Sequence, residues 1–135
     1  MKKLLSVKYS PGAFNAAMLI LRTGAGVLML SHGYDKLIHF NEKHNQFMSF
    51  MGMSSTVSYT LVVFAEFFCS VLLIMGLFTR LATIPLIIAM SVALIKAHGG
   101  DFWGDGEHAA LYLCTYLVLL FTGPGRISID GMINK

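Results

Sequence analysis

Long apolar stretches separated by short polar segments dominate the pattern of this chain. Two of them, residues 13–31 and 57–78, are about as long as a membrane-spanning helix and contain a single charged residue each. Two shorter apolar runs follow at residues 81–95 and 109–122. A helix needs about 20 residues to cross the hydrocarbon core of a bilayer, so the shorter runs must extend into polar neighbours. The pattern therefore predicts four spans, at about 13–37, 57–78, 81–98 and 107–122.

The composition agrees with a membrane protein. Of the 135 residues, 56% are hydrophobic and 13% are charged, whereas a soluble domain carries about 25% charged residues. We therefore expect one integral membrane domain over residues 1–135, folded as an all-α four-helix bundle in the lipid bilayer. The formal net charge of +3 gives no reason to expect a nucleic-acid partner. Cys69 and Cys114 lie in apolar runs without CxxC spacing, so both are expected to be buried thiols.

The segment between the first two spans has a helical pattern of its own. Asn41 can cap a short helix from Glu42 to Met51, which Gly52 can end. Its large apolar residues fall mostly on one side and its polar residues on the other. This predicts a short interfacial helix in the first outer loop, with a plain connecting loop as the alternative.

The distribution of lysine and arginine predicts the orientation of the spans. An even number of spans places both termini on one side of the membrane. That side carries six basic residues and the opposite side carries three, Lys36, Lys43 and Lys96. Because basic loops stay in the cytoplasm, both termini are expected to be cytoplasmic, with the acidic segment 99–107 outside.

Arg22 and Glu66 are the single charges within the two long runs. A charge at the centre of a span costs about 2.5–3.5 kcal/mol on insertion scales, and such a residue marks a site or a pairing. Helical rise places Arg22 about 12 Å and Glu66 about 18 Å from the inner surface. The sequence therefore predicts an Arg22–Glu66 pair, which is either a polar binding site or an ion pair that only fixes helix contacts.

A second polar group is expected nearer the outer surface. His32, Glu107 and His108 share a depth, and the spacing of 108, 112 and 116 forms one polar stripe along the fourth span. As an alternative, the two tyrosines are core aromatics with satisfied hydroxyls. The candidate site residues are Arg22, His32, Glu66, Glu107, His108, Tyr112 and Tyr116. The five histidines have no metal-ligand spacing, so no metal site is predicted.

Three segments carry a family resemblance. LRTGAGVLMLSHGYDKL (21–37), AEFFCSVLLIMGLFTRLAT (65–83) and EHAALYLCTYLVLLFTGPGRISID (107–130) resemble, in this order, the conserved blocks of the DoxX family. The resemblance implies a four-helix protein of the bacterial inner (cytoplasmic) membrane. Phe67-Phe68-Cys69 departs from the small glycines that many relatives carry after the glutamate. Gly24, Gly26 and Gly33 of the first block suit close approach between helices.

The resemblance implies no single reaction. The family includes the membrane subunit of a thiosulfate:quinone oxidoreductase and members linked to oxidative-stress complexes. The sequence itself has no haem motif, CxxC or nucleotide-binding loop, so any oxidoreductase role would need a quinone or a partner subunit.

Three functions remain open. The first is a membrane subunit or small-molecule module that binds a quinone-like or lipid-like molecule. The second is a small transporter or proton path. The third is a structural partner in a larger membrane complex, with another membrane protein or a second copy of this chain.

Overall fold

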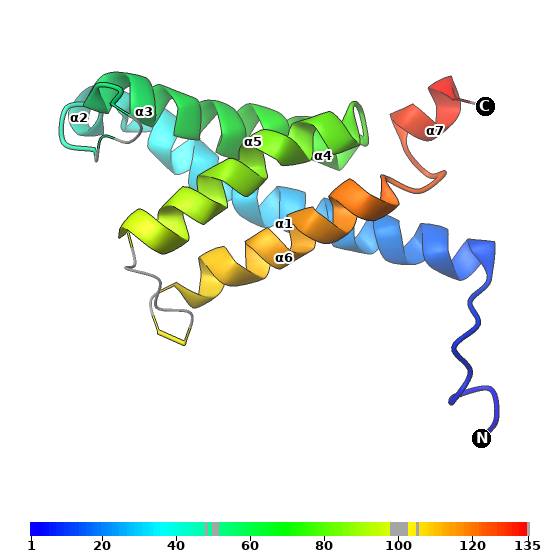
Figure 1. Ribbon diagram of the computed structural model, residues 1–135. Helices are drawn as coiled ribbons and strands as arrows, with labels where there is room; N and C mark the ends of the chain where they lie inside the picture. Colours follow the sequence, from blue (N-terminus) through cyan, green and yellow to red (C-terminus); the bar gives the residue numbers. More distant parts are fainter. Residues whose placement is uncertain (48, 50–51, 98–102, 105, 135) are drawn as a thin grey trace.

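Four helical segments run alternately up and down in the computed structural model, and both chain termini lie at the same end (Figure 1). The structure describes residues 1–134 except 48, 50–51, 98–102 and 105; these residues form helices and no strands. Three helices are long and apolar enough to cross a membrane: Pro11–Ile38, Ser55–Met75 and Thr79–Lys96. The predicted all-α membrane fold is thereby confirmed. The end of the bundle that carries the termini is called the terminal end below, and the other is called the loop end.

Helix α1 (Pro11–Ile38) is the longest element, because it has a clear start signal and no interior breaker. Ser10 caps it by accepting a hydrogen bond from the N–H of Ala13 at 3.1 Å, and Pro11 occupies the first turn, where its missing N–H is not needed. Its 28 residues span about 42 Å. The helix is therefore longer than the bilayer core is thick.

The second span consists of α3 (Ser55–Val63), the π-helical segment η1 (Phe64–Cys69) and α4 (Ser70–Met75). Ser54 caps its start by accepting from the N–H of Val57 at 3.2 Å. Gly76, in the left-handed conformation with φ 71°, ends it. This helix therefore ends three residues before the predicted limit at Phe78.

The remaining helices complete the bundle. Helix α5 (Thr79–Val92) continues into η2 (Ala93–Ala97), and α6 (Glu107–Thr122) packs along α5. The predicted end of the third span at His98 and most of the acidic segment 99–107 lie outside the described residues. Helix α6 has 16 residues, or about 24 Å, and the short helix α7 (Ile129–Ile133) follows it.

Two of the four glycines of α1 mark where it touches the second span. A Cβ on Gly33 would lie 2.6 Å from the backbone carbon of Glu66, and one on Gly26 would lie 2.6 Å from the Cγ1 of Ile74. Such distances admit no side chain, so these glycines let α1 pack directly against η1 and α4. Gly24 differs, because a Cβ there would meet nothing within 4 Å. The expectation of close approach is therefore wrong for Gly24 within the described structure.

The first loop contains less helix than expected. The predicted helix from Glu42 to Met51 is replaced by α2 (Phe40–Lys43), which His39 precedes without a side-chain cap, and by turns. Residues 48, 50 and 51 lie outside the described part. The Ser55 hydroxyl donates to the carbonyl oxygens of His44 and Phe47, at 2.6 Å each. These carbonyls are therefore bonded to the start of α3 instead of to a continuing helix.

The bundle core is apolar and lies between α5, α6 and the middle of α1 and α4. Leu73, Leu86, Tyr116 and Leu119 are fully buried in it. Cys69 is also buried, but Cys114 is exposed on α6, so the expectation of two buried thiols holds only for the first.

Candidate functional site

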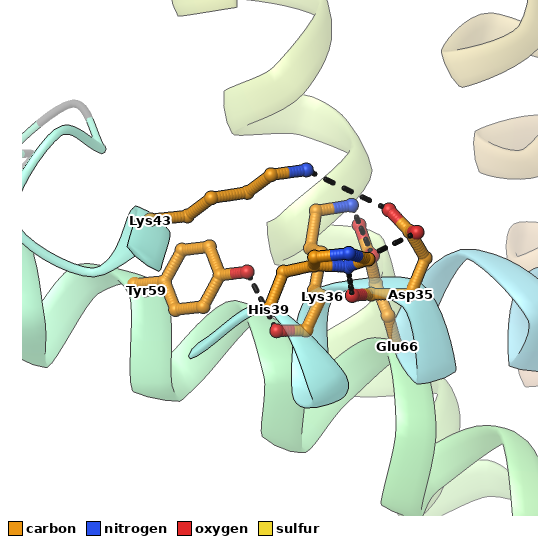
Figure 2. A network of polar contacts seen from close by, with 6 residues as sticks. All are labelled: Asp35, Lys36, His39, Lys43, Tyr59 and Glu66. Carbon is orange, nitrogen blue, oxygen red and sulfur yellow. Dashed lines mark hydrogen bonds and ion pairs between the residues drawn. The ribbon is translucent and has the colours of Figure 1, made fainter. Parts of the chain in front are cut away.

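The buried carboxylate of Glu66 forms an ion pair with Lys36. The Lys36 Nζ lies 2.6 Å from Glu66 Oε2, with the two side chains 27% and 6% exposed (Figure 2). The pair joins the last turns of α1 to η1, and Gly33, three residues before Lys36, allows the two backbones to approach closely. Glu66 itself sits in a π-helical turn, a local distortion that is frequent at functional sites.

Further polar groups surround Lys36 at the loop end. The Tyr59 hydroxyl donates to the carbonyl oxygen of Lys36 at 2.6 Å. Asp35 contacts His39 Nδ1 at 3.3 Å and Lys43 Nζ at 3.7 Å (Figure 2). A hollow of about 430 Å³ opens here, called the loop-end hollow below. It is lined by His32, Asp35, Lys36, Lys43, Gln46, Phe47 and Tyr59.

Arg22 lies elsewhere, and the predicted Arg22–Glu66 pair is wrong. The guanidinium is 2% exposed and donates from Nη1 to the Pro124 carbonyl at 3.1 Å and from Nη2 to the Ile127 carbonyl at 2.9 Å. Arg22 precedes Gly33, the residue packed on Glu66, by eleven positions of α1, or about 16 Å. The depth estimate was wrong because it assumed that α1 begins at the level where the second span ends. Arg22 instead lies at the level of Gly76, where a Cβ on Gly76 would be 2.6 Å from Arg22 Nη1, so α1 extends beyond the end of α4.

Arg22 instead holds residues 123–130, called the C-terminal clasp below. Within the clasp, Asp130 accepts hydrogen bonds from the N–H groups of Phe78 (2.8 Å) and Thr79 (2.9 Å), and its own N–H donates to the Gly76 carbonyl (2.8 Å). Asp130 thereby satisfies free donors at the start of α5, where Phe78 provides no side-chain cap. Arg22 thus ties the clasp to α1, and Asp130 ties it to the turn between α4 and α5.

The structure brings together only some of the residues of the predicted outer polar group. His32 contacts the Tyr112 ring edge-on, with centroids 6.2 Å apart, and Tyr112 stacks on Tyr116 at 6.0 Å. The Glu66 carboxylate is close enough to both tyrosine hydroxyls for an electrostatic interaction. Tyr116 is fully buried, and its hydroxyl has no hydrogen-bond partner among the described residues.

Glu107 and His108 are exposed in the first turn of α6. In the described ranges neither takes part in an ion pair. The predicted stripe on α6 therefore has an exposed start and a buried end, and His32 joins it at Tyr112.

A groove of about 350 Å³ lies between α1 and α6. Its floor includes Gly24, whose missing side chain leaves open space. His108 and Tyr112 are the polar side chains toward its loop end, and the other lining residues are Ile20, Leu21, Ala25, Leu28, Leu111 and Thr115. We call it the α1–α6 groove.

Sequence reasoning missed Lys36 and Tyr59 as parts of the Glu66 surroundings. Lys36 falls inside the predicted span 13–37 and was counted only as one of the basic residues of the outer side; it lies in the last turn of α1. Its spacing of three from Gly33 was the available signal, since residues three apart share a helix face and a helical glycine indicates close backbone approach. Tyr59 gave no comparable signal. The described residues contain no group of three His, Cys, Asp or Glu side chains that could hold a metal ion.

Comparison with known proteins gives a consistent family result. The DoxX family model matches residues 17–99. An uncharacterized membrane protein of Mycobacterium tuberculosis is 28% identical over 88% of this chain and 82% of its own length. An uncharacterized protein of Haemophilus influenzae is 30% identical, with 87% and 91% covered, and the inner membrane protein YphA of Escherichia coli is 25% identical, with 84% and 87% covered. No solved structure gave a significant match.

Proposed function

Because this chain belongs to the DoxX family of membrane proteins, we propose that it is a small-molecule module of the bacterial inner membrane. Its ligand is amphipathic, of a quinone-like or lipid-like kind. The apolar part of the ligand lies in the α1–α6 groove, and its polar head lies beside His108, Tyr112 and His32. The α1–α6 groove is the observation that carries the proposal.

The chemistry of the groove supports an amphipathic ligand. Its volume of about 350 Å³ falls in the usual range of ligand pockets, about 300–1,000 Å³. Aliphatic side chains form most of its walls, and donors and acceptors gather toward one end, at His108 and Tyr112. Such an arrangement orients a molecule whose head is polar and whose tail is apolar.

Filling the groove tests the proposal. Gly24→Leu places a side chain into open space, and replacing an interior helical glycine does not weaken the helix. Gly12→Leu is the matched control, because Gly12 lies in the same helix and is equally open but does not line the groove. We expect at least tenfold weaker binding of a short-chain quinone in Gly24→Leu and unchanged binding in Gly12→Leu.

The molecules that co-purify with the protein provide a second measurement. Mass spectrometry after gentle extraction should find a quinone or a specific lipid with the native chain and the Gly12→Leu variant, and less of it with Gly24→Leu. Equal retention by all three would contradict the proposal. A stoichiometric partner protein without such a molecule would favour a structural subunit, and proton-coupled flux in liposomes would favour a transporter or proton path.

A further inference from the structure

The loop-end hollow is a second cavity. It shares no lining residue with the α1–α6 groove, and the two are neighbours through the contact of His32 with Tyr112. It lies where the end of α1 meets the first loop and α3, and its lining is much more polar. Lys36 and Lys43 both reach it, together with the amide of Gln46. Ammonium and amide groups are hydrogen-bond donors that suit an anion with several acceptor oxygens.

The charges around the hollow balance before any ligand binds. Lys36 is paired with Glu66, and Lys43 with Asp35. These two pairs differ in depth, because the Asp35 carboxylate is largely exposed and that of Glu66 is 6% exposed. An anion added next to Lys36 would therefore share its ammonium with a buried carboxylate. Two like charges at one site favour protonation of one of them.

We propose that the loop-end hollow binds a phosphate group on Lys36 and Lys43, and that binding is coupled to the uptake of one proton by Glu66. The proton keeps the net charge around the hollow unchanged: one negative charge arrives on the ligand, and one is removed from Glu66. The same chemistry fits a free phosphate ester and the phosphodiester headgroup of an anionic lipid.

Other titratable groups near Glu66 are possible proton acceptors, and they can be separated by experiment. Helix α1 presents His32 and Asp35, with His39 directly after it, and the second span adds Tyr59. Helix α6 adds Tyr112 and Tyr116. In the described part of α5 and η2, the charged residues are Arg80, at the terminal end, and Lys96, which is exposed. Of these groups, the histidines are the rivals that change charge near neutral pH.

The test uses the full chain in phosphatidylcholine nanodiscs and dimethyl phosphate, whose single charge stays constant between pH 5 and 8. Coupling to one proton makes the dissociation constant fall by up to tenfold for each unit that the pH is lowered. Calorimetry in two buffers of different ionisation enthalpy measures the protons taken up directly, without any variant. We expect close to one proton per bound anion at the upper end of the pH range.

Three substitutions assign the roles. Glu66→Gln should bind dimethyl phosphate with the tighter, low-pH affinity at every pH, because its side chain is always neutral. Glu42→Gln removes an exposed carboxylate of the same loop and should keep the pH dependence. Lys43→Met should weaken binding about tenfold and keep the coupling, because Lys36 and Glu66 remain. Size-exclusion elution and cooperative unfolding verify that each variant is folded.

Exchanging a fraction of the phosphatidylcholine for phosphatidylglycerol distinguishes a free phosphate ester from a lipid headgroup as the source of the bound phosphate group. Preferential retention of phosphatidylglycerol, without binding of dimethyl phosphate, identifies a lipid headgroup, provided that Lys43→Met weakens this retention. Binding of neither ligand by the native chain would overturn the proposal. A pH dependence that persists in Glu66→Gln would also overturn it, because a histidine would then carry the proton. The result is independent of the groove, since Gly24→Leu should leave phosphate binding unchanged.

Discussion

At the scale of single residues, the main feature is that the buried charges of Glu66 and Arg22 have different kinds of partner. Glu66 is neutralised by an ammonium group that reaches down from the end of α1. The Nη1 and Nη2 atoms of Arg22 donate to backbone carbonyl oxygens of the C-terminal clasp, and its Nε has no hydrogen-bond partner among the described residues. The first arrangement leaves the lysine in contact with a hollow, whereas the second buries the guanidinium completely. We therefore expect Glu66 and Lys36 to respond to ligands and Arg22 to act mainly on stability.

The Lys36–Glu66 contact predicts non-additive effects on stability. Removing one partner of a buried pair leaves an uncompensated charge, and with Lys36 partly exposed we expect each of Glu66→Gln and Lys36→Met to cost about 1–3 kcal/mol. The double variant should cost less than the sum, by a coupling energy of about 0.5 kcal/mol or more. Thermal unfolding in one detergent measures all four proteins. Strictly additive losses would show that the contact contributes no stability.

Sequence reasoning found both buried charges but paired them with each other, for a physical reason. Charged residues within apolar runs are visible in any sequence. Because a charge in the membrane is energetically costly, each of them is expected to have a compensating partner. The identity of the partner depends on helix register and on chain that folds back. The pairing of Lys36 with Glu66 depends on helix register. The bonds of Arg22 to the carbonyl groups of Pro124 and Ile127 depend on chain that folds back, and an apolar pattern does not show which carbonyl groups will lie beside a guanidinium.

At the scale of elements, the contact between α1 and the second span depends on glycine. Gly33 places the α1 backbone against the backbone of Glu66 and Phe67, and it does so beside a π-helical turn. The irregular turn and the close contact together set the position of the Glu66 side chain relative to Lys36. The sequence predicted close approach at three glycines, but only the structure separates the packed positions from the open one at Gly24.

Gly33→Ala should therefore separate the two helices. The new methyl group would lie 2.6 Å from the Glu66 backbone, and overpacking of this kind costs about 1–3 kcal/mol. Gly24→Ala is the matched control and should leave stability unchanged or raise it, since its Cβ meets nothing. Unfolding in detergent compares the two variants. Equal stability of both would show that α1 and η1 are not in direct contact.

At the scale of the whole molecule, the order and direction of the helices follow from the apolar pattern. The four apolar runs were visible because apolar length is the strongest signal in a membrane sequence. The first loop was less predictable: the expected ten-residue helix gave way to α2 and turns, because Ser55 bonds the loop carbonyls. The direction of the whole bundle in the membrane rests on the count of basic residues alone.

Cysteine labelling tests that direction. We expect an impermeant thiol reagent, added outside intact cells, to label a cysteine at Asn45 but not one at Ser6 or Asn134, because the basic residues favour cytoplasmic termini. All three positions are exposed, so access depends only on the side of the membrane. The background should carry Cys69→Ala and Cys114→Ala. Labelling at Ser6 and Asn134 instead of Asn45 would reverse the orientation.

The C-terminal clasp also has a consequence for the order in which the protein is made. Arg22 enters the membrane early, but its partners Pro124 and Ile127 lie 102 and 105 residues further along the chain. At ~5–20 residues per second of synthesis, the guanidinium waits about 5–20 s for them. During that time α1 carries an unpaired cation, at about 2.5–3.5 kcal/mol on insertion scales. A ribosome that stalls before residue 124 therefore leaves a chain whose first helix carries this cation without either of its carbonyl acceptors.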